Sequence, residues 1–145
     1  MVILVSSCLM GNDCRYKGDN CKNEKILSLS DKHVLIPVCP EVMGGLPTPR
    51  DPSEKVGDRI INSAGKDVTA EYAAGAQKTL QIAKETSAEL CIFKAKSPSC
   101  GHGKIYDGTF SGRLIDGNGV TAELLERNGY KVITEADEDE LALLL

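Results

Sequence analysis

Apolar residues along the chain gather in four short runs that alternate with polar, helix-forming segments. The four runs are residues 2–7 (VILVSS), 33–38 (HVLIPV), 89–95 (ELCIFKA) and 131–135 (KVITE). The first run is continuously apolar, which is typical of a strand buried on both faces of a parallel sheet. The pattern therefore predicts four short strands, the first of them buried.

Segments with helical spacing lie between and after these runs. The clearest helix covers residues 69–88, with Thr69 placed to cap its first turn. Its inward positions recur at helical spacing: Tyr72, Ala76, Leu80 and Ala83. A weaker helix is expected within 22–32, with Ile26 and Leu27 on its inner side. Two more are expected at 118–130, which Asn128 and Gly129 close, and at 136–145.

The alternation of strands and helices predicts an α/β protein. We expect a mostly parallel sheet with helices on both faces, a three-layer and Rossmann-like arrangement, in a single domain over residues 1–145. Residues 41–55 are rich in Pro and Gly and predict a long irregular loop. Residues 58–72 predict a hairpin-like excursion with its turn at 63–65.

Composition narrows the classes of function. The chain has 145 residues and a formal net charge of -4, which gives no electrostatic argument for binding long nucleic acid. Binding of a small base or nucleotide is compatible with this charge. No apolar run approaches the roughly 20 residues that span a bilayer, which predicts no membrane segment. The apolar N-terminus lacks a positive leader, so we interpret it as a strand and expect a cytoplasmic location.

The sequence contains six cysteines, and three of them follow the predicted strands. Cys8, Cys39 and Cys100 each come just after a strand end, and the carboxyl ends of parallel strands share one edge of a sheet. We therefore expect these three thiols to converge. Cys91 lies within a strand, as a small buried apolar residue does. Cys14 and Cys21 lie in a polar stretch of the chain. Each can be a metal ligand, a redox partner or a passive loop thiol, and we favour the passive role.

Three converging thiols without a nearby histidine suit a soft metal site, either an iron–sulfur cluster or zinc. The chain has no C-x-x-C motif, and a cluster with three protein thiolates leaves one iron free for a substrate. Near these cysteines lie polar groups for proton transfer: Glu41, Ser97 and Ser99. We interpret His102 as solvent-facing.

Basic residues near the expected site can hold an anion, although a surface position is favoured for each: Arg15, Lys17 and Arg50. The segment SPSCGHGK does not fit a phosphate-binding P-loop, because Pro98 replaces the first glycine and Ile105 follows the lysine.

Three segments, SSCLMGNDCRYKG, VCPEVMGGLPTPR and KAKSPSCGHG, together resemble the 2-thiouracil desulfurase family over nearly the whole chain. The resemblance implies a [4Fe-4S] cluster bound by Cys8, Cys39 and Cys100, with a fourth iron open to the sulfur of a thiocarbonyl. It further implies a desulfidase that replaces this sulfur with water oxygen and releases sulfide without net redox change. The implied substrate is a thiolated pyrimidine, 2-thiouracil or a 4-thiouridine nucleotide. Glu41 is the first candidate for the proton relay, with Ser97 assisting and Ser99 as its substitute.

Two other functions remain open at this point. The same thiols fit a non-catalytic module that senses metal or redox state through zinc or a cluster, with Cys14 or Cys21 as a fourth ligand. A metal-free enzyme with Cys100 as its nucleophile is the third hypothesis.

Overall fold

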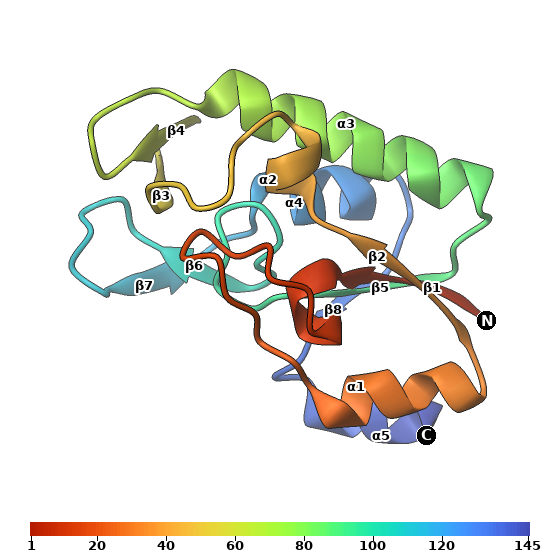
Figure 1. Cartoon of the computed structure of the whole chain (residues 1–145). Coiled ribbons are helices and arrows are strands. Elements are labelled where there is room, and N and C mark those ends of the chain that lie inside the picture. The colour runs from red at the N-terminus through yellow and green to blue at the C-terminus, as the bar shows by residue number, and fades with distance from the viewer.

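Four parallel strands form the central sheet, in the spatial order β2-β1-β5-β8 (Figure 1). The computed structural model describes residues 1–145. The strands are β1 (Val2–Ser6), β2 (Val34–Val38), β5 (Leu90–Phe93) and β8 (Val132–Thr134). All three neighbouring pairs are parallel. The four predicted strands and their parallel arrangement are confirmed.

Helices cover both faces of this sheet, which confirms the predicted α/β class (Figure 1). On one face lie α1 (Glu24–Ser28) and α5 (Glu138–Leu144), together with the short 3-10 helices η1 (Ser7–Met10) and η2 (Leu29–Asp31). On the other lie α3 (Thr69–Glu85) and α4 (Val120–Arg127). Each face buries its own apolar cluster against the strands. None of the helices combines the length and apolar character that crossing a membrane requires.

The four predicted inward residues of α3 are buried, namely Tyr72, Ala76, Leu80 and Ala83. The prediction that Thr69 caps this helix is wrong, because its hydroxyl accepts a hydrogen bond from the Ile60 N–H at 2.8 Å. In α1, Ile26 is buried as predicted, but Leu29 rather than Leu27 is its buried neighbour. Asn128 ends α4, and Gly129 follows with a φ of +90°.

A fifth helix, α2 (Pro40–Met43), occupies the start of the segment predicted to be an irregular loop. Proline fits the first helical position because a backbone N–H there would have no partner within the helix, so its absence costs nothing. Glycine lets α2 approach α3 closely: a Cβ on Gly75 would lie 1.8 Å from the Pro40 carbonyl oxygen. This contact fixes Glu41, in the first turn of α2, just beyond the end of β2.

Two antiparallel hairpins lie at the carboxyl edge of the sheet (Figure 1). One pairs β3 (Ser53–Val56) with β4 (Arg59–Asn62), and the other pairs β6 (Lys104–Tyr106) with β7 (Leu114–Asp116). The first hairpin therefore begins inside the predicted loop, and its own turn is at residues 57–58. The predicted turn at 63–65 is a second reversal, after which Asp67 bridges back to Ile61. The second hairpin was not predicted.

Candidate functional site

A pocket of about 530 Å³ opens at the carboxyl edge of the parallel sheet. Its inner end is formed by residues at and after the ends of three neighbouring strands: Ser6 to Cys8 at the end of β1, Cys39 to Glu41 after β2, and Lys94 to Pro98 after β5. Because parallel strands end at one edge, segments far apart in sequence meet here. This is the location at which ligands bind in open α/β sheets.

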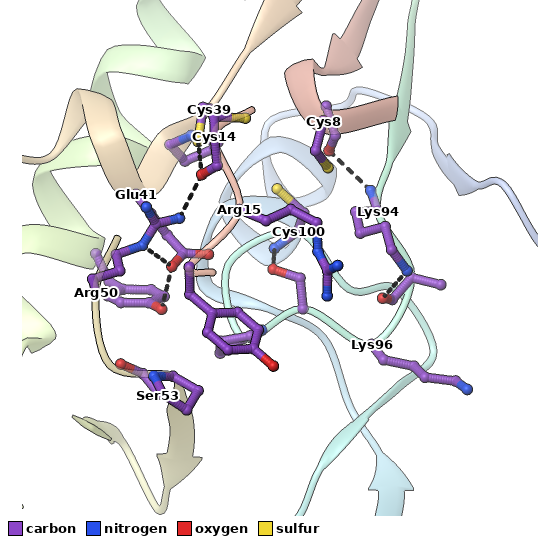
Figure 2. Close-up of a pocket in the computed structure, with 18 of the residues that line it drawn as sticks. Cys8, Cys14, Arg15, Cys39, Glu41, Arg50, Ser53, Lys94, Lys96 and Cys100 are labelled. Carbon is purple, nitrogen blue, oxygen red and sulfur yellow. Dashed lines mark hydrogen bonds and ion pairs between the residues drawn. The ribbon is translucent and has the colours of Figure 1, made fainter. Parts of the chain in front are cut away.

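The three cysteines predicted to converge all line this pocket. Cys8 lies in η1, Cys39 directly precedes α2, and Cys100 lies in the turn after β5. Figure 2 shows their side chains around the inner end of the pocket. The structure thus brings the three thiols together, while their role as cluster ligands stays a prediction.

Cys14 is a fourth thiol in the same pocket, so its interpretation as a passive loop thiol is wrong about its position. Cys14 lies beside Cys39, whose thiol donates a hydrogen bond to the Cys14 carbonyl oxygen at 3.8 Å (Figure 2). The chain reverses at Gly11, whose φ is +96°, and this reversal returns Cys14 toward Cys8. By contrast, Cys21 packs beside the apolar cluster on the α1 face, and Cys91 is fully buried within β5, as predicted.

Two of the pocket thiols, those of Cys39 and Cys100, lie in surroundings that disfavour their ionised form. Burial raises the pKa of Cys100 to about 12, and this residue is only 5% exposed. The hydrogen bond with Cys14, followed by burial, raises the pKa of Cys39. An activated nucleophilic cysteine needs the opposite, a lowered pKa and an accessible sulfur. The hypothesis of a metal-free thiol enzyme therefore loses its support.

The donor set fits an iron–sulfur cluster. It consists of thiols without histidine, which is the ligand chemistry of such clusters. No group of three His, Cys, Asp or Glu side chains is spaced to hold a single metal ion. Thiolates that bind different irons of one cluster do not need to surround a single point, so this spacing is compatible with a cluster.

Glu41 points its carboxylate into the pocket from α2 (Figure 2). Its Oε1 accepts hydrogen bonds from Arg50 Nε at 3.0 Å and from the Tyr72 hydroxyl at 2.8 Å. Both bonds end on the same oxygen, which leaves Oε2 available to a ligand. Burial, and then the negative charge of Glu41, raise the pKa of Tyr72, so its phenol remains a protonated donor.

The side chain of Arg50 is enclosed by the protein, so its interpretation as a surface charge is wrong. Its side chain is only 6% exposed. Besides Glu41, its guanidinium donates to the carbonyl oxygens of Cys14 at 2.9 Å and Pro47 at 3.2 Å, and to Thr48 Oγ1 at 3.1 Å. Arg50 therefore ties the carboxylate to the loop that carries the fourth thiol.

Ser97 and Ser99 have different positions although only Pro98 separates them. Ser97 lines the pocket, and its Oγ accepts hydrogen bonds from the N–H groups of Ser99 at 3.1 Å and Cys100 at 3.0 Å. Ser99 is 1% exposed, is not among the lining residues, and pairs with the Thr121 hydroxyl at 2.8 Å. The structure therefore does not bring the Ser99 hydroxyl to the pocket with Ser97, because it faces α4, and the role of Ser99 as a substitute stays a prediction.

The pocket also contains groups that sequence reasoning did not select. They include cationic, aromatic and acidic side chains: Lys94, Lys96, Tyr16, Tyr106, Phe110 and Glu54. Lys94 pairs with Glu135 at 2.8 Å, and Arg15, also in the pocket wall, pairs with Asp19 at 3.2 Å. His102 lies away from the pocket and contacts Glu126.

Fold and site together define an α/β protein whose sheet edge carries a pocket of four thiols beside a buried ion pair. The chain belongs to the 2-thiouracil desulfurase family, whose family model matches residues 3–137. The predicted family is confirmed.

Two similar proteins agree with this membership. The uncharacterized protein YbbK of Bacillus subtilis (strain 168) is 47% identical in an alignment of 150 positions that covers 97% of this chain and 99% of that protein. The solved structure of a [4Fe-4S]-dependent thiouracil desulfidase, TudS, superimposes with a TM-score of 0.88 at 40% identity. That match covers 97% of this chain and 95% of TudS.

Proposed function

We propose that this chain is a desulfidase that holds a [4Fe-4S] cluster through Cys8, Cys39 and Cys100 and removes sulfur from a thiolated pyrimidine. The observation that carries the proposal is the meeting of these three thiols with the Glu41 carboxylate in one pocket. Its volume of about 530 Å³ suits a small ligand such as 2-thiouracil or a 4-thiouridine nucleotide. The similarity to TudS supports both the cluster and the class of substrate.

The proposed reaction exchanges one atom. Water adds its oxygen to the thiocarbonyl carbon, the carbon–sulfur bond breaks, and sulfur leaves as hydrogen sulfide with both protons of the water, so no electrons are transferred. A [4Fe-4S] cluster held by three thiolates supplies an iron that lacks a protein ligand and acts as a Lewis acid toward soft sulfur.

The residues of the chain position water and move its protons. Glu41 Oε2 is free to accept a proton from the attacking water, because Oε1 is already occupied by Arg50 and Tyr72. Ser97 Oγ accepts two backbone bonds, so its own proton can be donated into the pocket. Ser97 also fixes the turn that carries Cys100.

The proposal places the protein in the cytoplasm, because thiols that hold a cluster must stay reduced. Its partner is a small thiopyrimidine rather than long nucleic acid, in keeping with a net charge of -4.

Anaerobic reconstitution tests the ligand set. Protein treated with iron and sulfide is assayed for bound iron, acid-labile sulfide and visible absorption, and then for sulfide release from 2-thiouracil and from a 4-thiouridine nucleotide. Single Ala variants of Cys8, Cys39 and Cys100 are expected to lose cluster and turnover. Cys21→Ala is the matched control, since Cys21 lies outside the pocket, and it should retain both. Full cluster content in all three ligand variants would refute the assignment.

The role of Glu41 is tested separately from that of the ligands. Glu41→Gln keeps the shape of the side chain but removes the proton acceptor, so we expect the cluster content to remain unchanged. Sulfide release should fall at least ~100-fold, which is the lower end of the rate contribution of a single acid–base group. Unchanged turnover in this variant would assign the proton transfer to another group.

The position of Cys14 favours one second candidate, a closed cluster with four protein thiolates in a non-catalytic sensing module. Its thiol lies beside those of Cys8 and Cys39, where a fourth ligand is available. In that case, 2-thiouracil would leave the visible spectrum of the cluster unchanged and no sulfide would appear. Under the leading proposal the spectrum shifts on addition of the thiopyrimidine, both in the wild-type protein and in Cys14→Ala.

A further inference from the structure

The outer wall of the pocket has its own construction, separate from the thiols and from Glu41. It is formed by Glu54, on β3, and by the loop between β6 and β7, which carries Phe110. β3 lies against β6, so the two hairpins meet at this wall. Neither residue has a part in the proposed transfer of sulfur.

The Glu54 carboxylate holds the loop in place. Its Oε1 accepts hydrogen bonds from the backbone N–H groups of Gly108 at 3.0 Å and Phe110 at 3.2 Å. The loop is also pressed against β3, because a Cβ on Gly108 would lie 2.7 Å from the Lys55 carbonyl oxygen. The backbone of this loop is therefore fixed relative to the pocket.

Phe110 adopts an unfavourable conformation at this position. Its φ is +56°, in the left-handed region that residues with a Cβ rarely occupy. Its side chain nevertheless remains 42% exposed while it lines the pocket, so its ring does not gain the burial that a core phenylalanine gains. A strained aromatic residue held partly open at a pocket is the kind of outlier that indicates a functional role.

The second oxygen of Glu54 is available to a ligand. Glu54 is only 9% exposed, and both bonds from the loop end on Oε1. Every fully buried side-chain oxygen in the chain has a hydrogen-bond partner, so Oε2, which bonds no residue, must have some access to solvent. Since Glu54 lines the pocket, Oε2 is an acceptor at the pocket wall.

We propose that Glu54 and Phe110 form a recognition site for the non-reacting part of a flat heterocyclic ligand. The phenyl ring packs against the face of the heterocycle, and Glu54 Oε2 accepts a hydrogen bond from a ligand donor, either a ring N–H or a sugar hydroxyl. The choice of a pyrimidine as this heterocycle rests on the proposed function, whereas the acceptor and the aromatic wall do not.

Binding of uracil and uridine tests this site, because these compounds carry oxygen in place of sulfur and are therefore not turned over. Uracil and uridine are titrated calorimetrically into the reconstituted wild-type protein and its variants. Glu54→Gln keeps an oxygen for the loop but replaces the free acceptor with a donor, and it is expected to weaken binding ~10-fold or more. Phe110→Leu keeps bulk without a ring and should weaken binding ~5-fold, while Phe110→Tyr should restore it. Ser111→Ala, in the same loop but outside the pocket lining, is the matched control.

The two ligands distinguish the donors. If the donor is the ring N3–H, which both compounds carry, Glu54→Gln weakens both uracil and uridine. If it is the N1–H, which is replaced by the sugar in uridine, only uracil is weakened, and if it is a sugar hydroxyl, only uridine is weakened. Affinities of Glu54→Gln and Phe110→Leu equal to that of Ser111→Ala would overturn the inference, as would a wild-type protein that binds neither compound at millimolar concentration. Sulfide release is measured in parallel. If binding depends on Phe110 but no sulfide is released, the recognition site stands and only the proposed reaction fails.

Discussion

Replacement of Arg50 by methionine is expected to destabilise the protein strongly. The change keeps an unbranched side chain but removes the 3.0 Å bond to Glu41 and the bonds to Cys14, Pro47 and Thr48. It also leaves the Glu41 carboxylate, 18% exposed, without its cation. Removing one partner of a buried ion pair lowers the free energy of unfolding by about 3–5 kcal/mol. Because Glu41 is partly exposed, we expect the lower end of this range, about 3 kcal/mol.

The double variant isolates the ion pair from the other contacts. Glu41→Gln removes the charge that Arg50→Met leaves unpaired, so the combined loss should be smaller than the sum of the two single losses by about 2 kcal/mol. Urea unfolding followed by far-UV circular dichroism measures these free energies, under reducing conditions and with the same metal content in every sample. Arg59→Met is the matched control, because Arg59 pairs with Asp67 at an exposed position and its loss should be much smaller.

The reasoning would be refuted by two results together. One is an unfolding free energy of Arg50→Met within about 1 kcal/mol of the wild-type value, and the other is additivity with Glu41→Gln. Both would mean that the ion pair contributes little beyond what water offers to the separated charges.

Three further predictions follow from the fold and the site. Gly75→Ala places a Cβ 1.8 Å from the Pro40 carbonyl oxygen and should cost about 3 kcal/mol in urea unfolding, with loss of cluster binding as α2 shifts. Ser97→Ala should lower sulfide release at least ~10-fold, whereas Ser99→Ala should keep most of the activity and lose about 1 kcal/mol of stability. Hydrogen bonds from Thr69, then Arg59, hold the pKa of Asp67 at about 2 instead of 3.8. Because this pKa is lower in the folded state, Asp67 stabilises the protein above roughly pH 4 and this contribution is lost toward pH 2, so Asp67→Asn should flatten the pH dependence of unfolding in that range.

Each of these predictions has a contrary outcome. Wild-type stability in Gly75→Ala would mean that α2 and α3 are not in close contact. Equal activities of Ser97→Ala and Ser99→Ala would contradict the assignment of only one hydroxyl to the pocket. An unchanged slope of stability against pH in Asp67→Asn would show that Thr69 and Arg59 do not hold this carboxylate.

The strands and long helices could be predicted because their patterns are local. Continuous apolar runs indicate strands buried on both faces, and the parallel order then places every residue that follows a strand at one edge. This reasoning was sufficient to bring Cys8, Cys39 and Cys100 to one pocket. The short helix α2 escaped it, because four residues in a Pro- and Gly-rich segment are held mainly by the contact between Pro40 and Gly75. Strands β6 and β7 have three residues each, too few to show a period.

The misjudged site residues depend on contacts that no local pattern contains. The Arg50 side chain is enclosed because the Glu41 carboxylate and the Cys14 carbonyl accept hydrogen bonds from it, and neither partner is adjacent in sequence. Cys14 joins the other thiols through a reversal at Gly11, which was the one available signal. Ser97 and Ser99 differ because the turn between them rotates one hydroxyl toward the pocket and the other toward α4. Such directions follow from tertiary structure rather than from residue type.

The pocket is built from two kinds of segment: three of its thiols follow the strands of the central sheet, and Glu54 and Phe110 lie on the two hairpins. This division has a consequence for how the family can diversify. Cys8, Cys39 and Cys100 stand on segments that follow the strands, so the central sheet fixes their positions. Glu54 and Phe110 stand on peripheral excursions whose length and side chains can be exchanged with little effect on that frame. New ligand preferences can therefore evolve at the entrance while the reactive centre is inherited unchanged.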